Sequence, residues 1–139
     1  METLRWDNRF SVGNQAIDLQ HKMLFNLINY LVFNSGKACK RHEMTEILEE
    51  LIAYTEYHFT AEEALLKGHS TFAAHHAAHA EFIDKARHFE KAFQEQKEEI
   101  NGDLFAYLVR WIREHILETD CLFFQEQAQK TRPGDVSGE

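Results

Sequence analysis

FAAHHAAHAEFIDKARHFEKAF, residues 72–93, decides the fold class of this chain. Its bulky side chains recur every three or four residues, which is the spacing of one face of an α-helix and not of a strand. We therefore predict a helix that opens at Ser70 or Thr71. The inward stripe of this helix comprises Phe72, His75, His79, Phe82, Ala86, Phe89 and Phe93.

Three further segments show the same helical spacing of apolar residues. We expect them to begin after Asp18, at about His42 and after Asp103, because aspartate is a preferred helix N-cap. The second of them should end near Lys67, before Gly68. Their inward-facing apolar residues are Leu24, Leu27, Ile28 and Leu31; then Ile47, Leu51, Tyr54 and Leu65; then Leu104, Leu108, Trp111, Ile112 and Leu122.

Short breaks separate the helical segments, notably NSGKACKR (34–41) and KEEINGD (97–103), and no stretch alternates long enough to predict a strand. Four amphipathic helices with connections of roughly 4–8 residues favour an all-α fold, an antiparallel up-down four-helix bundle. We expect an irregular N-terminal arm over residues 1–17, the bundle over residues 18–129 and a flexible tail over residues 130–139. The residues of the arm that should pack on the bundle are Trp6, Phe10 and Val12.

Composition limits what this chain binds. It has 139 residues, a formal net charge of −8 and no run of Lys and Arg longer than two residues. Nucleic acids and anionic membranes reward clustered cations, so neither is expected as a partner. The opening METLRWDNRF lacks the apolar core of a signal peptide, and no apolar run is long enough to span a bilayer. We therefore expect a cytoplasmic monomer in which Cys39 and Cys121 are free thiols.

Polar residues occupy the inward faces of all four predicted helices, where an amphipathic helix normally carries apolar ones. Buried polar groups without partners cost up to several kcal/mol each, and a domain stable by about 5–15 kcal/mol cannot sustain a whole set of them. A shared metal would satisfy the set at once. The residues concerned are His21, His58, Glu62, His75, His79, His115 and Asp120.

The number of donor atoms indicates which metal is bound. Five imidazole nitrogens, two carboxylates that each bridge two ions, and one bridging oxide or hydroxide provide eleven bonds. Two six-coordinate ions need twelve, so one position stays open for a small ligand. A single zinc ion needs about four ligands and would leave the rest unused. Imidazole and carboxylate at high coordination number suit iron, with manganese or cobalt as less favoured occupants.

The position of Asp120 requires a local departure from α-helical geometry. Asp120 follows His115 by five residues, which on a regular α-helix places the two side chains about 140° apart. Both cannot then reach one site. We therefore predict a π-type widening of the fourth helix between them, a feature often found at functional sites.

Four motifs carry a resemblance to a known family. IDLQHKML (17–24), HFTAEE (58–63), HHAAHAEF (75–82) and WIREHILETD (111–120) together resemble the hemerythrins. The family pattern is one His, then His-x3-Glu, His-x3-His and His-x4-Asp on successive helices. The lead-in RWDNRFSVGNQAID is similar to the single-domain bacterial branch, the bacteriohemerythrins, so the resemblance covers most of the chain, from about residue 4 to about residue 125.

The resemblance implies a non-haem di-iron centre, with two iron ions (Fe2+/Fe3+) bridged by oxide or hydroxide. The ligands it assigns are His75, His79 and His115 for one iron, His21 and His58 for the other, and Glu62 and Asp120 as bridges. Dioxygen would bind at the iron with two histidines. The pocket walls it suggests are Phe59, Trp111, Ile112 and Ile116, of which Trp111 fits a role in core packing equally well.

The function implied is reversible dioxygen binding for storage, sensing or delivery to an oxygen-consuming enzyme, without an enzymatic reaction of its own. Carboxylate-rich di-iron enzymes use four acids and two histidines. Replacing two of those acids with neutral imidazoles leaves the centre more positive and stabilises high-valent iron less. Two alternatives remain open: a di-iron enzyme acting on peroxide, nitric oxide or ferrous iron, and a purely structural helical module.

The remaining polar residues have simpler interpretations. By helix geometry Glu63, next to Glu62, should face outward. His76 is expected in solvent, because the apolar stripe of its helix selects His75 for the interior. The other histidines predicted at the surface are His42, His69 and His88.

Overall fold

The computed structural model of the chain describes residues 3–34, 37–95 and 102–131. Every element in these ranges is helical, and they contain no strand. The elements are the 3-10 helix η1 (Asn8–Phe10), α1 (Gln15–Phe33), the 3-10 helix η2 (Ala38–Lys40), α2 (Arg41–Leu66), α3 (Phe72–Gln94), α4 (Gly102–Glu114), the π-helix η3 (His115–Asp120) and α5 (Cys121–Thr131).

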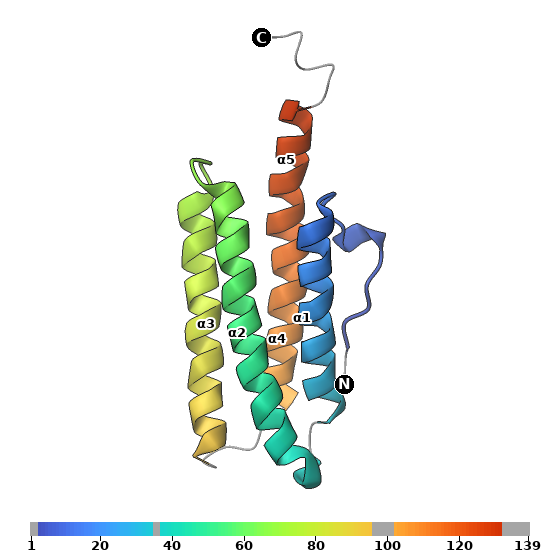
Figure 1. The fold of residues 1–139 in the computed structure, drawn as a ribbon, viewed down its shortest axis with the longest axis vertical. Helices are drawn as coiled ribbons and strands as arrows, with labels where there is room; N and C mark the ends of the chain where they lie inside the picture. Colours follow the sequence, from blue (N-terminus) through green and yellow to red (C-terminus); the bar gives the residue numbers. More distant parts are fainter. Residues whose placement is uncertain (1–2, 35–36, 96–101, 132–139) are drawn as a thin grey trace.

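The helices form an up-down bundle in which successive long helices run antiparallel (Figure 1). Elements α4, η3 and α5 follow one another without a break and act as a single fourth helix. Helix α2 packs against α1 and α3, and α1 packs against α4. The predicted all-α four-helix bundle is confirmed.

Helix α1 begins earlier than its sequence suggested. The N-cap is Asn14, whose side-chain oxygen accepts the Ile17 N–H at 3.1 Å. Asp18, the predicted cap, lies in the first turn, where its carboxylate accepts hydrogen bonds from the Val12 N–H and the Ser11 hydroxyl. Asp18 therefore joins the arm to the helix, and its negative charge is favourable at the positive end of the helix dipole.

The N-terminal arm lies along the bundle through aromatic contacts. Phe10 is buried, and Trp6 packs half-buried against the core. Their ring centroids lie 5.1 Å and 5.5 Å from that of Phe25 on α1. Leu4 exchanges two hydrogen bonds of 2.7 Å with the side-chain amide of Asn29, which fixes the start of the arm to the same helix.

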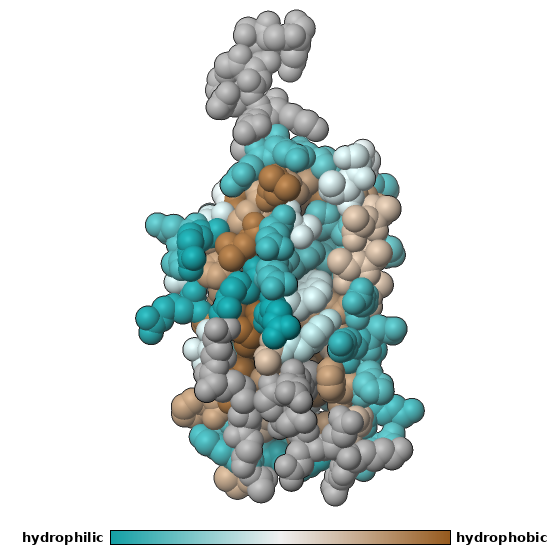
Figure 2. Space-filling view, turned by 180° about the vertical axis from the view of Figure 1, so that it is seen from behind, coloured by the Kyte–Doolittle hydropathy of each residue, from teal (hydrophilic) through white to brown (hydrophobic). Residues whose placement is uncertain are grey.

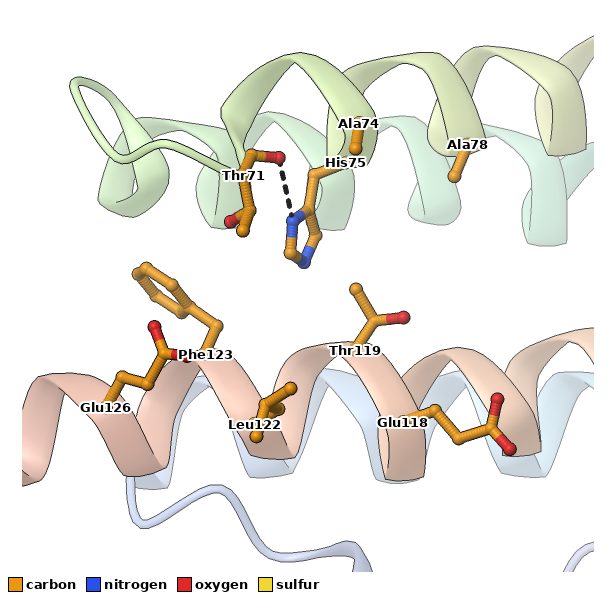
Figure 3. A pocket seen from close by; sticks show the side chains of 9 residues that line it. All are labelled: Thr71, Ala74, His75, Ala78, Glu118, Thr119, Leu122, Phe123 and Glu126. Atoms are coloured by element: carbon orange, nitrogen blue, oxygen red, sulfur yellow. Dashed lines mark hydrogen bonds between the residues drawn. The ribbon is translucent and has the colours of Figure 1, made fainter.

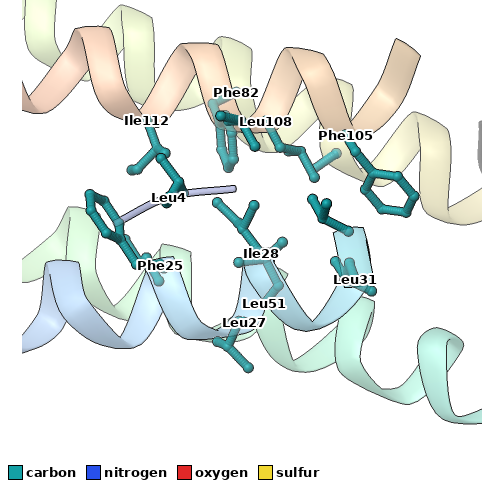
Figure 4. Close-up of a cluster of buried hydrophobic side chains, with 14 of the residues drawn as sticks. Leu4, Phe25, Leu27, Ile28, Leu31, Leu51, Phe82, Phe105, Leu108 and Ile112 are labelled. Atoms are coloured by element: carbon teal, nitrogen blue, oxygen red, sulfur yellow. The ribbon is translucent and has the colours of Figure 1, made fainter. Parts of the chain in front are cut away.

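Apolar side chains from all four helices meet in one core (Figure 4). Burying each large aliphatic or aromatic side chain contributes about 1.5–3 kcal/mol, so this core is the main source of folding free energy. The residues that Figure 4 places there include Phe25, Ile28, Leu31, Leu51, Phe82, Phe105, Leu108 and Ile112.

Two residues predicted to face inward are exposed instead: Leu65 by 50% and Leu122 by 55%. Leu66 is buried in place of Leu65, because it follows Glu62 by four residues and keeps its face. Phe123 is buried in place of Leu122, because the π-helix adds one residue to the turn before it. Regular α-helical spacing, carried through this turn, therefore predicts the inward-facing positions after it one residue too early.

The connection between α2 and α3 is held by a residue predicted at the surface. His69 follows Gly68, whose φ of +85° lies in the left-handed region that favours glycine. The His69 side chain is only 9% exposed, and its Nε2 lies 3.3 Å from a carboxylate oxygen of Glu126 on α5. Its ring meets that of Phe123 edge-on at 4.9 Å. His69 therefore ties this turn to α5, and the prediction of a surface histidine was wrong.

The predicted tail (130–139) is described only at Lys130 and Thr131, which form the end of α5 and not a tail. The predicted break (97–103) is described only at Gly102 and Asp103, which are the first residues of α4. The rest of both segments and the side chain of Leu104 lie outside the described residues. Among the helices of the described ranges, none combines the length and apolarity needed to cross a bilayer. On the face seen in Figure 2, apolar patches alternate with polar ones and form no continuous belt.

Candidate metal centre

The bundle brings the seven predicted polar residues together at one level of its interior. They come from α1, α2, α3 and η3, so each of the four helical columns contributes. Their exposed fractions are His21 0%, His58 0%, Glu62 0%, His75 3%, His79 2%, His115 6% and Asp120 1%.

Glu62 lies between two groups of histidines. Its Oε1 is 3.1 Å from His79 Nε2 and 3.5 Å from His115 Nε2. Its Oε2 is 3.3 Å from His58 Nε2 and 3.6 Å from His21 Nε2. One carboxylate thus presents one oxygen to each group, which is the arrangement of a ligand that bridges two ions.

Asp120 repeats this arrangement from the opposite helix. Its Oδ1 lies 3.5 Å from His75 Nε2 and 3.2 Å from His115 Nε2, whereas its Oδ2 lies 3.2 Å from His21 Nε2. Two overlapping sets of ligand atoms result, each within 4.8 Å: His21, His58, Glu62 and Asp120, and Glu62, His75, His115 and Asp120. Nε2 of His79 joins the second set, 3.0 Å from Nε2 of His115.

The π-helix allows both His115 and Asp120 to reach the interior. Residues His115–Asp120 form a π-helix, and the N–H of Cys121 donates to the carbonyl of Ile116, five residues earlier. The widened turn brings positions five apart onto the same face, as predicted from the spacing of the two ligands.

The donor atoms fit metal ions better than they fit one another. Seven donor atoms are buried without a hydrogen bond of acceptable geometry: Nε2 of His21, His58 and His75 and the four carboxylate oxygens of Glu62 and Asp120. Each of them nevertheless lies 3.1–3.6 Å from an oppositely charged or polar atom of the cluster. Ligands that hold one ion at about 2.1 Å and at right angles lie about 3 Å apart. The spacing of these atoms is therefore that of neighbouring ligands around a shared ion.

The electrostatics of the cluster favour cations. Burial disfavours protonation of His115, but the carboxylates of Asp120 and Glu62 outweigh it and raise the pKa of His115 to about 9. Burial would raise the pKa of Glu62, but the surrounding imidazoles hold that pKa well below its usual range. Both carboxyl groups thus remain ionised, since the pKa of Asp120 is also lowered despite its burial. The two buried carboxylates therefore stabilise positive charge in the cluster, whether on an imidazole or on a bound cation.

The match to known proteins covers the whole cluster: the family model described as the Hemerythrin HHE cation binding domain matches residues 12–126. The chain belongs to the hemerythrin family. It is 34% identical to a bacteriohemerythrin of Pseudomonas aeruginosa (strain LESB58) over 124 residues, covering 87% of this chain and 79% of that protein. It is 32% identical to a bacteriohemerythrin of Clostridium acetobutylicum, covering 83% of this chain and 94% of that one.

The fold agrees with that of a solved hemerythrin. The crystal structure of wild-type hemerythrin superposes with a TM-score of 0.83 at 29% identity, covering 89% of this chain and 97% of that one. This agreement extends through the bundle and supports the all-α architecture described above.

In this hemerythrin-family site, some histidines also hydrogen-bond through the ring nitrogen that points away from the cluster, and these bonds orient the imidazoles. Nδ1 of His58 lies 2.7 Å from Oε1 of Gln20 on α1. Nδ1 of His75 lies 3.3 Å from the carbonyl oxygen of Thr71. Such partners fix which imidazole nitrogen is free for a metal. Sequence reasoning missed both, although Gln20 stands immediately before a predicted ligand.

Glu63 does not face outward as predicted. Its Oε2 lies 2.8 Å from Nδ1 of His79, and its Oε1 lies 2.6 Å from Nδ1 of His76. A rotation of about 100° from Glu62 points it at the neighbouring helix α3 instead of at water. His76 is exposed, as predicted, with 63% of its side chain accessible.

Two of the four predicted pocket residues, Phe59 and Trp111, contact histidines of the cluster. The Phe59 ring stacks on His79 with centroids 3.8 Å apart, and Trp111 stacks on His115 at 4.5 Å. Phe59 and Trp111 also contact each other at 5.8 Å, and Ile112 and Ile116 are fully buried. The two aromatic rings thus cover His79 and His115 with apolar surface.

A groove between α3 and the η3–α5 column approaches the cluster from the surface (Figure 3). Its volume is about 230 Å³, and its walls include Thr71, Ala74, Thr119 and Leu122. In Figure 3 the imidazole of His75 points across the groove from α3 towards the facing helix. His75 is thus the predicted ligand that borders this surface hollow.

Proposed function

We propose that this hemerythrin-family chain holds two iron ions, bridged by oxide or hydroxide, and binds dioxygen reversibly. The observation that carries the proposal is the division of each bridging carboxylate between two histidine groups. The names of its bacteriohemerythrin relatives support it. The proposed ligands are His75, His79 and His115 for one iron, His21 and His58 for the other, and Glu62 and Asp120 as bridges.

In this proposal the number of histidines at each iron, three against two, determines which iron binds dioxygen. Three histidines and two bridging carboxylates leave one iron more fully coordinated than the iron held by two histidines. When bound, the two irons supply the electrons and the open coordination position that reversible oxygenation needs. We further propose that the chain acts as a cytoplasmic monomer that stores dioxygen, senses it or delivers it to an oxygen-consuming enzyme.

The protein's own contribution is to orient the ligands and to exclude water. Gln20 and Thr71 hold the outer nitrogens of His58 and His75, so that each Nε2 faces the interior. The proposed walls formed by Phe59, Ile112 and Ile116 carry no polar hydrogen, and together with the Trp111 ring they would limit water entry.

One experiment tests the proposal. The metal-free protein is loaded with ferrous iron without air, exposed to oxygen and then returned to vacuum, while its visible spectrum is recorded. A coloured species that forms and bleaches over repeated cycles is the expected result. Irreversible oxidation with release of peroxide would indicate a di-iron enzyme. Failure to take up iron would indicate a purely structural helical module. Either result would overturn the proposal.

A polar side chain in the proposed dioxygen pocket should make the oxygenated protein oxidise irreversibly at a higher rate. We expect Ile112→Thr to speed its irreversible oxidation tenfold or more, because a nearby hydroxyl supplies a proton and admits water, and positioned proton donors contribute about 10²–10⁴ in rate. The measurement is the decay of the oxygenated spectrum in air. Ile112→Val, which trims the same side chain without adding a polar group, is the control; equal decay of the two variants would contradict the role of the wall.

A further inference from the structure

We infer that Glu63 is a positioning residue for the metal centre: its carboxylate holds the outer N–H of His79 and strengthens that imidazole as a ligand of the three-histidine ion. The inference rests on the proposed di-iron centre and adds a residue to it. The Glu63 carboxylate meets the cluster at Nδ1 of His79 and acts through that histidine.

Both carboxylate oxygens of Glu63 are engaged. Oε2 accepts from Nδ1 of His79 at 2.8 Å, and Oε1 accepts from Nδ1 of His76 at 2.6 Å. The Glu63 side chain is 18% exposed, His79 only 2% and His76 63%. A chain of hydrogen bonds thus runs from the buried cluster through Glu63 to a histidine at the surface, and His76 holds the carboxylate from its outer side.

The contact decides how His79 can act as a ligand. A carboxylate only accepts, so Nδ1 of His79 must carry its proton. Nε2, which lies 3.1 Å from Oε1 of Glu62, is then the nitrogen left to bind a metal. The ring of Phe59, stacked on His79 and parallel to it within 3°, keeps the imidazole in this orientation.

Glu63 differs from the other outer partners in its charge. The corresponding partner of His58 is the neutral amide of Gln20, and that of His75 is the backbone carbonyl of Thr71. A charged acceptor draws the Nδ1 proton more strongly and makes the opposite nitrogen more basic. An iron held by His79 would therefore receive more electron density through this imidazole, which would favour its ferric form.

Zinc provides a test that needs no oxygen chemistry. We expect Glu63→Gln, which keeps an acceptor oxygen but removes the charge, to weaken the tighter zinc-binding event of the metal-free protein about tenfold. In the zinc-loaded protein the Nδ1 proton resonance of His79, observed by 15N-resolved NMR, should move upfield. His76→Gln, which leaves the carboxylate but replaces its surface partner, should produce a smaller change in the same direction.

Glu50→Gln is the matched control, because it removes the same charge from an exposed position on α2 about 20 Å along the helix. Zinc affinity and the His79 resonance should be unchanged there. In iron-loaded protein, Glu63→Gln should raise the reduction potential and Glu50→Gln should not. If Glu63→Gln matches the parent in zinc affinity and in the His79 proton resonance, the inference is wrong. If the parent protein does not bind dioxygen reversibly, the proposed function is wrong, but the zinc result still tests the role of Glu63.

Discussion

Replacing Glu62 with glutamine is expected to lower the affinity for both metal ions by at least about 100-fold, more than the loss of an outer partner costs. Glu62 presents Oε1 to His79 and His115 and Oε2 to His58 and His21. Glutamine has nearly the same shape, but its amide nitrogen cannot bind a cation and its oxygen carries no full charge. The number of iron ions retained per chain after gel filtration, together with the visible spectrum, measures the effect.

The same substitution at Glu50, exposed on the same helix, should leave iron content and spectrum as in the parent. Circular dichroism should show equal helix content for both variants, since the change in the core is isosteric. A Glu62→Gln protein that keeps full iron content and an oxygenated spectrum would show that Glu62 does not bridge the ions.

Removing the metal should lower the melting temperature by roughly 10–20 °C. A ligand bound to the folded state alone, present at 1,000 times its Kd, adds about 4 kcal/mol of stability, and each kcal/mol is worth roughly 3–5 °C for a domain of this length. The physical cause lies in the buried donor atoms of His21, His58, His75, Glu62 and Asp120, which lack hydrogen bonds in the protein alone. Calorimetry of the iron-loaded and chelator-treated protein measures the shift.

The Glu62→Gln variant provides the internal comparison for this measurement. At an iron concentration of 1,000 times the parent Kd, a site weakened about 100-fold gains at most about 1.4 kcal/mol from iron, so the variant should show less than half of the parent's shift in melting temperature. Equal melting temperatures of loaded and chelated parent protein would mean that the cluster gains nothing from a metal, and would remove the energetic reason for placing one there.

Much of the fold was predictable because its signals are local. Helical spacing alone placed Leu24, Ile28 and Leu31 inside, and all three are buried. The five-residue step from His115 to Asp120 was enough to predict the π-helix, because a regular turn cannot bring both to one side. Leu122 was predicted inside but is exposed for the same reason: the π-helix adds one residue to the turn and shifts the inward-facing positions after it by one.

Neighbouring helices decided what the helical pattern left open. Glu63 was expected in water because its own helix turns it away from Glu62, but α3 packs on that side and supplies His76 and His79. His69 was expected at the surface because it falls outside the pattern of inward-facing histidines, yet α5 covers it. A single-helix pattern contains no information about which residues another helix brings alongside it.

By itself, the amino-acid order determined four amphipathic helices and the polar residues on their inner faces, since both follow from rotation per residue along one chain. Only the packed bundle decided that Glu62 and Asp120 each direct one oxygen to one histidine group and the other oxygen to the second group. The same holds for the hydrogen bonds that Gln20, Glu63 and the Thr71 carbonyl make with the outer nitrogens of the histidines. These relations depend on the distances between separate helices. Such distances are set by side-chain packing across the whole core, which no local spacing encodes.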